Sequence, residues 1–373
     1  MTDVMKNVDE EILAGLYGKS LLLTRDYSRP ELDALLAVAR RFYELDRAGT
    51  KCNWLDAELA YALFFDKSTR TKSAWAGAAS RLGMHPVIVD GESTQVAHGE
   101  TAEETGAMLG MNAHALGVRH DTVLGVGNAF MRDVLAGIDA YLDQTGASRK
   151  VPIVNLQCDF DHPTQTLADL MWLQEQLGSL EGKKLVMSWA YSPSYAKPLS
   201  VAQGIVTLMT RFGATVTLAH PEGYTLMESE LRMADAFARD HGGRFEVVDS
   251  MSAAFEGAVA VYPKSWGPYD LMMERVAANE AGDKAALADI ERRALERNAK
   301  HKDWICDEAK MAKTKGGDAL YMHCLPADIG AEVTPGVMEA HRLNVAREAQ
   351  FKVYVIMALL ATAKVPDLIS RLS

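Results

Sequence analysis

The feature that most constrains the fold of this chain is a repeated alternation of short apolar runs with longer stretches of helical spacing. Such alternation is typical of βαβ units, in which parallel strands lie side by side and helices cover both faces of the sheet. In the first half the expected strands are residues 60–65, 86–90, 115–118 and 152–156, and the expected helices are 31–43, 71–82, 100–111 and 129–142. The first half therefore predicts a doubly wound parallel sheet.

A second alternation follows a long helical stretch at 164–177. Its expected strands are 185–189, 215–219, 245–248, 258–262 and 319–322. Residues 270–303 are charged and helical without a strand, which is typical of a surface insertion. Residues 346–363 are apolar enough to pack onto the body as a last helix. The second half therefore predicts another doubly wound parallel sheet.

The chain of 373 residues is longer than one ordinary hydrophobic core supports, so we expect two α/β domains. The boundary is placed beside the long helical stretch. The first domain is expected to comprise residues 1–165 joined by the C-terminal helix 346–373, and the second residues 166–345.

The net charge of −11 argues against a general nucleic-acid or anionic-membrane surface. The four cysteines lie far apart without a CxxC pair, so neither a disulfide framework nor a zinc site is indicated. The first residues are acidic and lack the apolar run of a signal peptide, and no stretch approaches the roughly 20 apolar residues of a membrane helix. We therefore expect a cytoplasmic protein.

A hydroxyl-rich turn directly follows the expected strand 60–65. Ser68, Thr69 and Thr71 supply hydroxyl donors, and Arg70 supplies a planar guanidinium suited to phosphate oxygens. Backbone N–H groups at the start of the following helix have no partner within the helix, and they favour an anion. The turn therefore predicts a phosphate site. In the alternative interpretation, a hydroxyl merely caps the helix and the arginine is solvated.

Other polar residues also follow expected strands, where open α/β sheets bind ligands. Arg119 ends the strand at 115–118 and offers a second guanidinium. His162 and Gln165 open the helix at 164–177, and the segment His-Cys-Leu-Pro at 323–326 follows the last expected strand. Taken alone, His162 could be a helix-start hydrogen-bonding residue and Cys324 a buried loop cysteine. The chain contains no GxxxxGK[ST] motif, so a nucleotide enzyme is disfavoured.

Three segments together resemble the motifs of one family. Ser-Thr-Arg-Thr at 68–71, His-Pro-Thr-Gln at 162–165 and His-Cys-Leu-Pro at 323–326 are similar to motifs of the aspartate/ornithine carbamoyltransferases, and they occur in the family's order. The resemblance runs from about Lys19 to the C-terminal helix. It implies that the first domain binds carbamoyl phosphate and the second binds the amine. It also implies homotrimers, or dimers of trimers, with active sites at subunit boundaries.

The resemblance implies a role for each residue of the donor site. The phosphate would be held by Ser68, Thr69, Arg70 and Thr71. Thr71, Arg119 and His162 would polarise the carbamoyl oxygen, where negative charge develops as the amine attacks. Gln165 would bind the carbamoyl nitrogen.

Two further residues match the family less directly. Arg347 aligns with a family arginine, although the usual Glu-Asn-Arg context is missing, and Gln95 matches a loop residue contributed by the neighbouring subunit. The leaving phosphate can take the proton of the amine, so no protein base is obligatory. No metal or organic cofactor is implied.

The acceptor site resembles the ornithine branch because Cys324 follows His323. Cys324 and Leu325 would offer backbone carbonyls to the attacking amine. Lys264, however, stands where ornithine enzymes have an aspartate that holds the α-ammonium group. A cation there would repel that group by roughly 1–4 kcal/mol, depending on the local dielectric. The sequence therefore disfavours free ornithine as the substrate.

The segment at 189–199 resembles a proline-containing loop of acetylornithine and succinylornithine transcarbamylases, which are knotted. The whole 185–270 stretch is most similar to the YgeW-type branch, so the resemblance also implies a trefoil knot in the second domain. The expected acceptor-site residues are Lys264, Ser265, Trp266, Cys324, Leu325, Tyr191 and Lys197. The two lysines suggest an anionic or acylated substrate, unless they are ordinary surface lysines.

The sequence thus predicts a carbamoyltransferase that acts on a small amino-acid-like amine, or the reverse phosphorolysis of a ureido compound. The alternative is a non-catalytic module that binds carbamoyl phosphate for a regulatory purpose. The amine and the physiological direction are left open.

Overall fold

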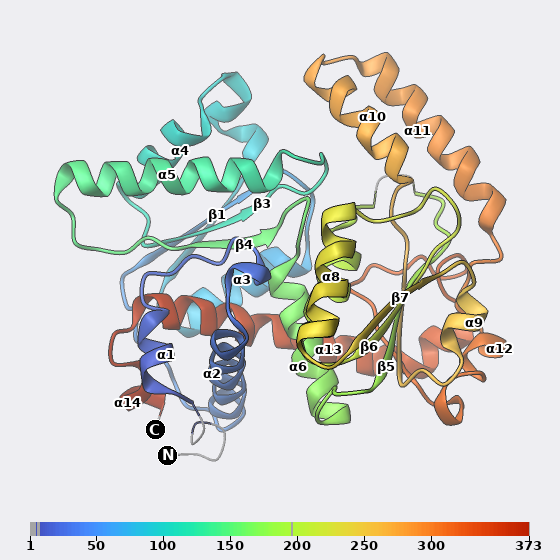
Figure 1. Ribbon diagram of the computed structural model, residues 1–373. Helices are drawn as coiled ribbons and strands as arrows, with labels where there is room; N and C mark the ends of the chain where they lie inside the picture. Colours follow the sequence, from blue (N-terminus) through green and yellow to red (C-terminus); the bar gives the residue numbers. More distant parts are fainter. Residues whose placement is uncertain (1–4, 6–7, 195–196, 373) are drawn as a thin grey trace. The chain divides into compact units, whose positions relative to one another are not determined.

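The computed structural model describes residues 5, 8–194 and 197–372, and the chain divides into two compact units (Figure 1). The first unit comprises Met1–Asp121, Gly125–Met171 and Gln350–Ser373, and the second comprises Thr122–Leu124 and Trp172–Ala349. Helices α6 (Pro163–Leu177) and α13 (Pro335–Lys364) each have one end in the first unit and the other end in the second. The expected boundary at residue 165 lies within α6.

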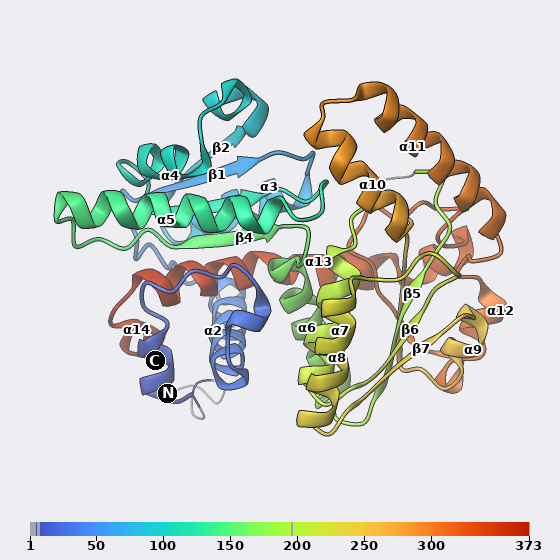
Figure 2. The same cartoon turned by 45° about the horizontal axis from the view of Figure 1, so that its top comes forward.

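The first unit is built on a four-stranded parallel sheet of order β2-β1-β3-β4. The strands are β1 (Leu59–Phe64), β2 (His85–Asp90), β3 (Ala115–Arg119) and β4 (Ile153–Gln157). The helices of this unit besides the parts of α6 and α13 are α1 (Glu10–Gly15), α2 (Arg29–Arg47), α3 (Arg70–Arg81), α4 (Ala102–Gly110), α5 (Gly127–Thr145) and α14 (Leu368–Leu372). Figure 2 shows α4 and α5 on one face of the sheet and α2 on the other. Short 3-10 turns lie at η1 (Thr24–Asp26), η2 (Gly91–Ser93) and η3 (Gln95–His98).

Local sequence signals explain where several of these helices begin and end. Ser28 and Glu31 form a capping box at the start of α2, and Thr101 and Glu104 form another at the start of α4. Helix α5 ends at Gly146, whose φ of 65° is favourable only for a residue without a side chain. Apolar residues of β3 and α5 then form one buried core. In this unit the helix ends and the buried apolar residues therefore both follow from the local sequence pattern.

The second unit is built on a five-stranded parallel sheet of order β7-β6-β5-β8-β9. The strands are β5 (Lys184–Trp189), β6 (Thr215–Ala219), β7 (Arg244–Val248), β8 (Ala260–Lys264) and β9 (Leu320–Tyr321). The helices are α7 (Ser200–Arg211), α8 (Glu228–Asp240), α9 (Met251–Phe255), α10 (Tyr269–Glu280), α11 (Lys284–Asn298) and α12 (Glu308–Met311), with 3-10 turns η4 (Ala299–His301) and η5 (Lys315–Gly317). Helix α7 is buried along its whole length, as expected of a helix within a doubly wound fold.

The predicted α/β class and the two parallel sheets are confirmed, and the expected strands are all present with small shifts at their ends. Residues 270–303 contain α10 and α11, which pack on each other around a small core of Leu271, Ala278, Ile290 and Ala294. Helix α13 is longer than the expected stretch 346–363 because it begins at Pro335, a residue that suits a first helical turn. Its early part gave little periodic signal, since Leu343 is exposed. Among the described residues, no helix is long and apolar enough to span a membrane.

Candidate functional site

The carboxyl ends of β1, β3 and β4 lie at the same edge of the first sheet because these strands are parallel. Phe64 stands in register with Arg119, which in turn pairs with Gln157. The N–H of Phe65 donates to the carbonyl of Arg119 at 2.9 Å. The segments that follow the three strands are therefore neighbours, and they contain the predicted donor-site residues.

The turn after β1 leads directly into α3. Thr69 precedes the helix, with φ −93° and ψ −54°, and its side chain caps no N–H group. The hydroxyl of Ser68 accepts from the N–H of Thr71 at 3.3 Å, so Ser68 does serve as a cap. Arg70, the first residue of α3, is half-buried. The turn therefore combines a capped helix start with a guanidinium and two further hydroxyls, an arrangement suited to an anion.

Lys352 on α13 is a cation that the sequence analysis did not identify. Its ammonium lies 3.4 Å from the hydroxyl of Thr71, and both residues are almost fully buried. A buried ammonium is costly unless polar groups or an anion compensate its charge. The available signal was a lysine within an otherwise apolar helical stretch, but only packing shows that it reaches the turn.

Arg347, by contrast, lies in the second unit and is half exposed. Its guanidinium forms an ion pair with Glu175 at 3.1 Å and lies 4.9 Å from the ring centre of Trp172. Within the first unit, the cation from α13 that contacts the anion turn is therefore Lys352.

Arg119 is held by a carboxyl group two positions further along the chain. Its Nε and Nη2 atoms donate to the two oxygens of Asp121 at 3.3 and 3.0 Å, and the N–H of Asp121 donates to Asp66 at 3.0 Å. Burial raises the pKa of Asp121 well above its ordinary value, and Asp66 raises it further, although Arg119 opposes both. The two hydrogen bonds to Asp121 orient the guanidinium. Arg119 is thus a fixed cation at the sheet edge.

His162 and Gln165 are both buried at the start of α6. The Nδ1 atom of His162 lies 3.4 Å from the hydroxyl of Thr164. The side-chain amide of Gln165 donates to Asp169 at 2.6 Å, one helical turn further on. That bond fixes the nitrogen of the amide, so its oxygen is left to accept a hydrogen bond. Such an acceptor suits a ligand that carries an NH₂ group.

Gln95 is exposed at the start of η3. Its expected role lies in a neighbouring subunit, and it stays a prediction. No group of metal-ligating side chains occurs in the part of the chain that the structure describes, and all four cysteines are free thiols.

In the second unit, both predicted lysines are engaged by protein groups. The ammonium of Lys264 is buried and donates to the carbonyls of Pro198 at 3.1 Å and Ser265 at 2.8 Å. Lys197 forms ion pairs with Asp328 at 2.7 Å and Glu332 at 2.8 Å. Neither is an ordinary surface lysine. The two lysines differ in their described partners, which are two carboxylates for Lys197 and backbone carbonyls for Lys264.

The residues beside Lys264 differ in what they offer a ligand. The N–H of Ser265 donates to Glu332 at 2.6 Å, whereas its buried hydroxyl has no partner among the described residues. Trp266 is fully buried, and its indole N–H donates to the carbonyl of Tyr224 at 2.8 Å. Tyr191 is half-buried, with its ring 6.0 Å from the ammonium of Lys302. Ser265 is therefore the residue of this group with an unused polar atom.

The predicted segment at 323–326 follows β9. The N–H of Leu325 donates to Nδ1 of the buried His323 at 2.8 Å, and Leu325 has a φ of 52°, which is uncommon for a residue with a side chain. Cys324 and Leu325 are half-buried. The backbone here is therefore held in an unusual conformation by a neighbouring imidazole.

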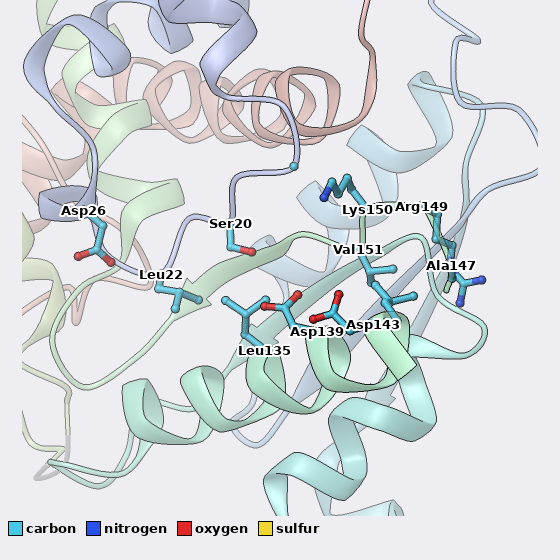
Figure 3. Close-up of a pocket in the computed structure, with 12 residues that line it drawn as sticks. Ser20, Leu22, Asp26, Leu135, Asp139, Asp143, Ala147, Arg149, Lys150 and Val151 are labelled. Carbon is cyan, nitrogen blue, oxygen red and sulfur yellow. The ribbon is translucent and has the colours of Figure 1, made fainter. Parts of the chain in front are cut away.

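A separate cavity of about 520 Å³ lies in the first unit (Figure 3). Asp139 and Asp143 on α5 line one side of it, and Ser20 and Lys150 also line it. None of the predicted site residues lines this cavity, so it is not part of the candidate site.

Comparison with known families matches two profiles to this chain. Residues 19–175 match the aspartate/ornithine carbamoyltransferase carbamoyl-P binding domain, and residues 197–363 match the Asp/Orn binding domain of the same family.

Individual relatives agree with these matches. The chain is 46% identical to YgeW of Escherichia coli (strain K12), a provisionally named carbamoyltransferase, over 97% of this chain and 95% of that protein. It is 32% identical to the N-acetylornithine carbamoyltransferase of Xylella fastidiosa (strain 9a5c), over 92% and 98% of the two chains. Among solved structures, the ornithine carbamoyltransferase of Pyrococcus furiosus superposes with a TM-score of 0.75 at 26% identity. The match covers 93% of this chain and 97% of that one. A variant of N-acetyl-L-ornithine transcarbamylase complexed with carbamyl phosphate and N-succinyl-L-norvaline superposes with a TM-score of 0.75 at 28% identity. The match covers 92% of this chain and 99% of that one.

Proposed function

We propose that this chain, which belongs to the aspartate/ornithine carbamoyltransferase family of enzymes, transfers a carbamoyl group. The donor is carbamoyl phosphate, and the acceptor is a small amino-acid-like amine. The amine is anionic or acylated and is not free ornithine. The same site can run in reverse, as phosphorolysis of a ureido compound. The observation that carries the proposal is the hydroxyl-rich turn at 68–71, which contacts the buried Lys352 and follows the strand whose last residue, Phe64, pairs with Arg119.

The first unit would bind the donor. Backbone N–H groups at the start of α3 and the side chains of Ser68, Thr69 and Arg70 hold the phosphate. Lys352 adds a buried positive charge beside Thr71. Arg347 remains a weaker candidate, since its guanidinium is engaged by Glu175. The structure of a relative with bound carbamyl phosphate supports this choice of donor.

Attack by the amine pushes negative charge onto the carbamoyl oxygen. Thr71, Arg119 and His162 would stabilise that charge, and preorganised donors of this kind contribute more than any other single effect in many enzymes. The oxygen of Gln165 would accept from the carbamoyl NH₂ group, because Asp169 already engages the amide nitrogen. The C–O bond to phosphate breaks, and the phosphate leaves with the proton of the amine.

The second unit would bind the acceptor. The backbone carbonyls of Cys324 and Leu325 would receive the N–H groups of the amine, and the hydroxyl of Ser265 offers a further contact. Tyr191 and Trp266 would shape the site. Lys264 disfavours a free α-ammonium group and suits a carboxylate or an acyl oxygen. The N-acetylornithine relatives support an acylated amine.

The activity is tested by phosphate release from carbamoyl phosphate with a panel of N-acetyl-L-ornithine, N-succinyl-L-ornithine, L-ornithine and L-aspartate. Arg70→Ala should lower turnover by on the order of 100-fold, because charge-assisted hydrogen bonds to the phosphate are lost. Arg81→Ala, at the other end of α3, is the matched control and should retain activity.

An unchanged rate in Arg70→Ala would exclude the assigned donor site. Carbamoyl phosphate binding by calorimetry, without turnover of any amine or of N-acetylcitrulline with phosphate, would favour the non-catalytic regulatory module instead.

Assembly as a homotrimer, or a dimer of trimers, is part of the proposal. Gln95 would then act in the site of an adjacent subunit. Sedimentation equilibrium measures the mass directly. Mixing Gln95→Ala with Arg70→Ala subunits should restore some activity, because only a shared site can pair an intact Gln95 with an intact Arg70.

A knot in the second unit is proposed on the resemblance of the 189–199 loop. The carbonyl of Lys197 accepts from Gly267 at 3.1 Å, and the carbonyl of Trp266 accepts from the indole of Trp189 at 2.9 Å. The loop and the segment after β8 are therefore in contact, as threading requires. A crystal structure with continuous density from residue 185 to 270 would decide the topology.

A further inference from the structure

We infer that Glu332 and His323 form a buried positioning pair that holds the acceptor-binding backbone in place. This inference rests on the proposed function, since it concerns how the acceptor site of that reaction is built. Neither residue is assigned contact with a substrate. Their effect would reach the amine through Leu325 and Ser265.

Glu332 joins three segments that lie far apart in the sequence. Its carboxylate accepts from the N–H of Ser265 at 2.6 Å and from the ammonium of Lys197 at 2.8 Å. It also accepts from the N–H of Asp328 at 2.8 Å. These partners come from the segment after β8, the 189–199 loop and the segment after β9. One side chain therefore connects the elements that carry the proposed acceptor residues.

The carboxyl group is fully buried, and its surroundings favour the ionised form. Burial alone would raise the pKa of Glu332, but His323 and Lys197 outweigh that effect and keep the pKa below its ordinary value. A buried charge persists only where hydrogen bonds and an opposite charge compensate it. Among the described residues, loss of this carboxylate would therefore leave Lys197 paired with Asp328 alone.

His323 lies between Glu332 and the backbone of Leu325. Its Nδ1 accepts from the N–H of Leu325, so the proton of the neutral ring is on Nε2. That Nε2 atom lies 3.4 Å from Oε2 of Glu332. Burial lowers the pKa of His323, which favours the neutral form. The imidazole thus faces a carboxylate with its donor nitrogen and the Leu325 backbone with its acceptor nitrogen.

The backbone of Leu325 needs such support. Its φ of 52° lies in the left-handed region, which a residue with a side chain adopts only where surrounding contacts enforce it. Residues in such conformations cluster at functional sites. Because Glu332 also holds the N–H of Ser265, it orients both sides of the proposed amine-binding surface: the carbonyls of Cys324 and Leu325, and the unused hydroxyl of Ser265.

The test compares Glu332→Gln with Glu308→Gln, a control at an exposed glutamate of the same unit. With the amine that the panel identifies, Glu332→Gln should raise KM for the amine at least about tenfold. The dissociation constant for carbamoyl phosphate, measured by calorimetry, should stay within about twofold. An unchanged KM, or an equal loss of affinity for carbamoyl phosphate, would overturn the inference.

Amide hydrogen exchange of the full chain gives a readout that needs no amine. Peptides covering residues 186–194 and 322–329 should exchange faster in Glu332→Gln than in the control, and a peptide covering α3 should not change. If the panel finds no substrate, the proposed function fails. Separately, the positioning role would be refuted if each of the three peptides exchanged at the same rate in Glu332→Gln as in the control.

A second pair of variants covers the case in which Glu332→Gln does not fold. His323→Asn keeps an acceptor for the N–H of Leu325, whereas His323→Leu removes it. His323→Asn should retain a KM within about threefold of the unmodified enzyme, and His323→Leu should raise it at least about tenfold. Equal effects of the two substitutions would show that the hydrogen bond to Leu325 does not position the acceptor.

Discussion

The two units assemble their candidate sites in different ways. In the first unit, most contacts of the predicted residues are local: Ser68 with Thr71, Arg119 with Asp121, and Gln165 with Asp169. In the second unit, the corresponding contacts join distant segments, because Glu332 accepts from both Lys197 and Ser265. A site made of local contacts can be recognised in the sequence from short motifs. A site made of distant contacts depends on packing, and this is why the donor could be predicted in more detail than the acceptor.

The largest expected effect tests the local charge of the donor site. Arg119→Met should lower kcat by about 100- to 1,000-fold, because a fixed donor to the developing negative charge is removed. Steady-state phosphate release with the amine from the panel measures it. Arg132→Met, an exposed arginine on α5, is the control and should leave kcat unchanged. A kcat within about threefold of normal in Arg119→Met would remove Arg119 from the mechanism.

The next effect tests a contact of the donor site between residues that lie far apart in the sequence. Lys352→Met should weaken carbamoyl phosphate binding by about 10- to 100-fold, the effect of losing one charge-assisted interaction. Calorimetry without any amine measures the affinity. Lys364→Met removes a lysine at the far end of the same helix and should not change it. If both variants bind carbamoyl phosphate normally, Lys352 is a structural lysine and does not belong to the donor site.

A smaller effect tests the charge of the acceptor site. Lys264→Met should raise turnover of L-ornithine about tenfold, because the like charge that repels its α-ammonium group is gone. The panel assay measures this gain, and Lys313→Met, an exposed lysine of the same unit, should show none. Circular dichroism confirms that the variant is folded. A folded Lys264→Met enzyme without any gain would show that Lys264 does not select the acceptor.

The smallest effect concerns stability and pH. The folded-state pKa of Glu332 is lowered, so its ionised form stabilises the fold above its unfolded pKa of about 4.3. That contribution is lost progressively as the pH falls below this value. The unmodified chain should therefore lose about 1 kcal/mol or more of unfolding free energy between pH 6 and pH 3 beyond the loss in Glu332→Gln. Urea denaturation at both pH values measures the difference, and parallel losses would contradict the assigned charge state.

Much of the fold followed from local pattern. The strand that ends at Arg119 and the helices that carry Arg70 and Gln165 were expected, because period-2 and period-3.6 spacing are properties of short segments. The start of α13 at Pro335 was not predicted, because its first turns are mostly polar and contain only Val337 and Met338 as buried apolar residues before Val345. Lys352 was missed for a different reason. Nothing in its neighbourhood along the chain shows that it reaches Thr71, 281 positions away.

The acceptor site shows the same limit more strongly. Lys197 and Lys264 were singled out as residues, but their partners were not predicted. In the structure Lys197 is offset by Asp328 and Glu332, whereas Lys264 donates to backbone carbonyls. The two lysines therefore differ in the groups they contact, and some of these contacts join segments more than 60 positions apart.

The sequence by itself determined the α/β class, the two parallel sheets, the membership of the carbamoyltransferase family and the turn at 68–71. It did so because periodicity, helix starts and contiguous motifs are all encoded within short stretches. Only the tertiary structure decided that Lys352 lies against Thr71 and that Glu332 joins Lys197 and Ser265. The physical reason is that packing, rather than local propensity, determines which distant polar groups share a buried environment and compensate each other's charge.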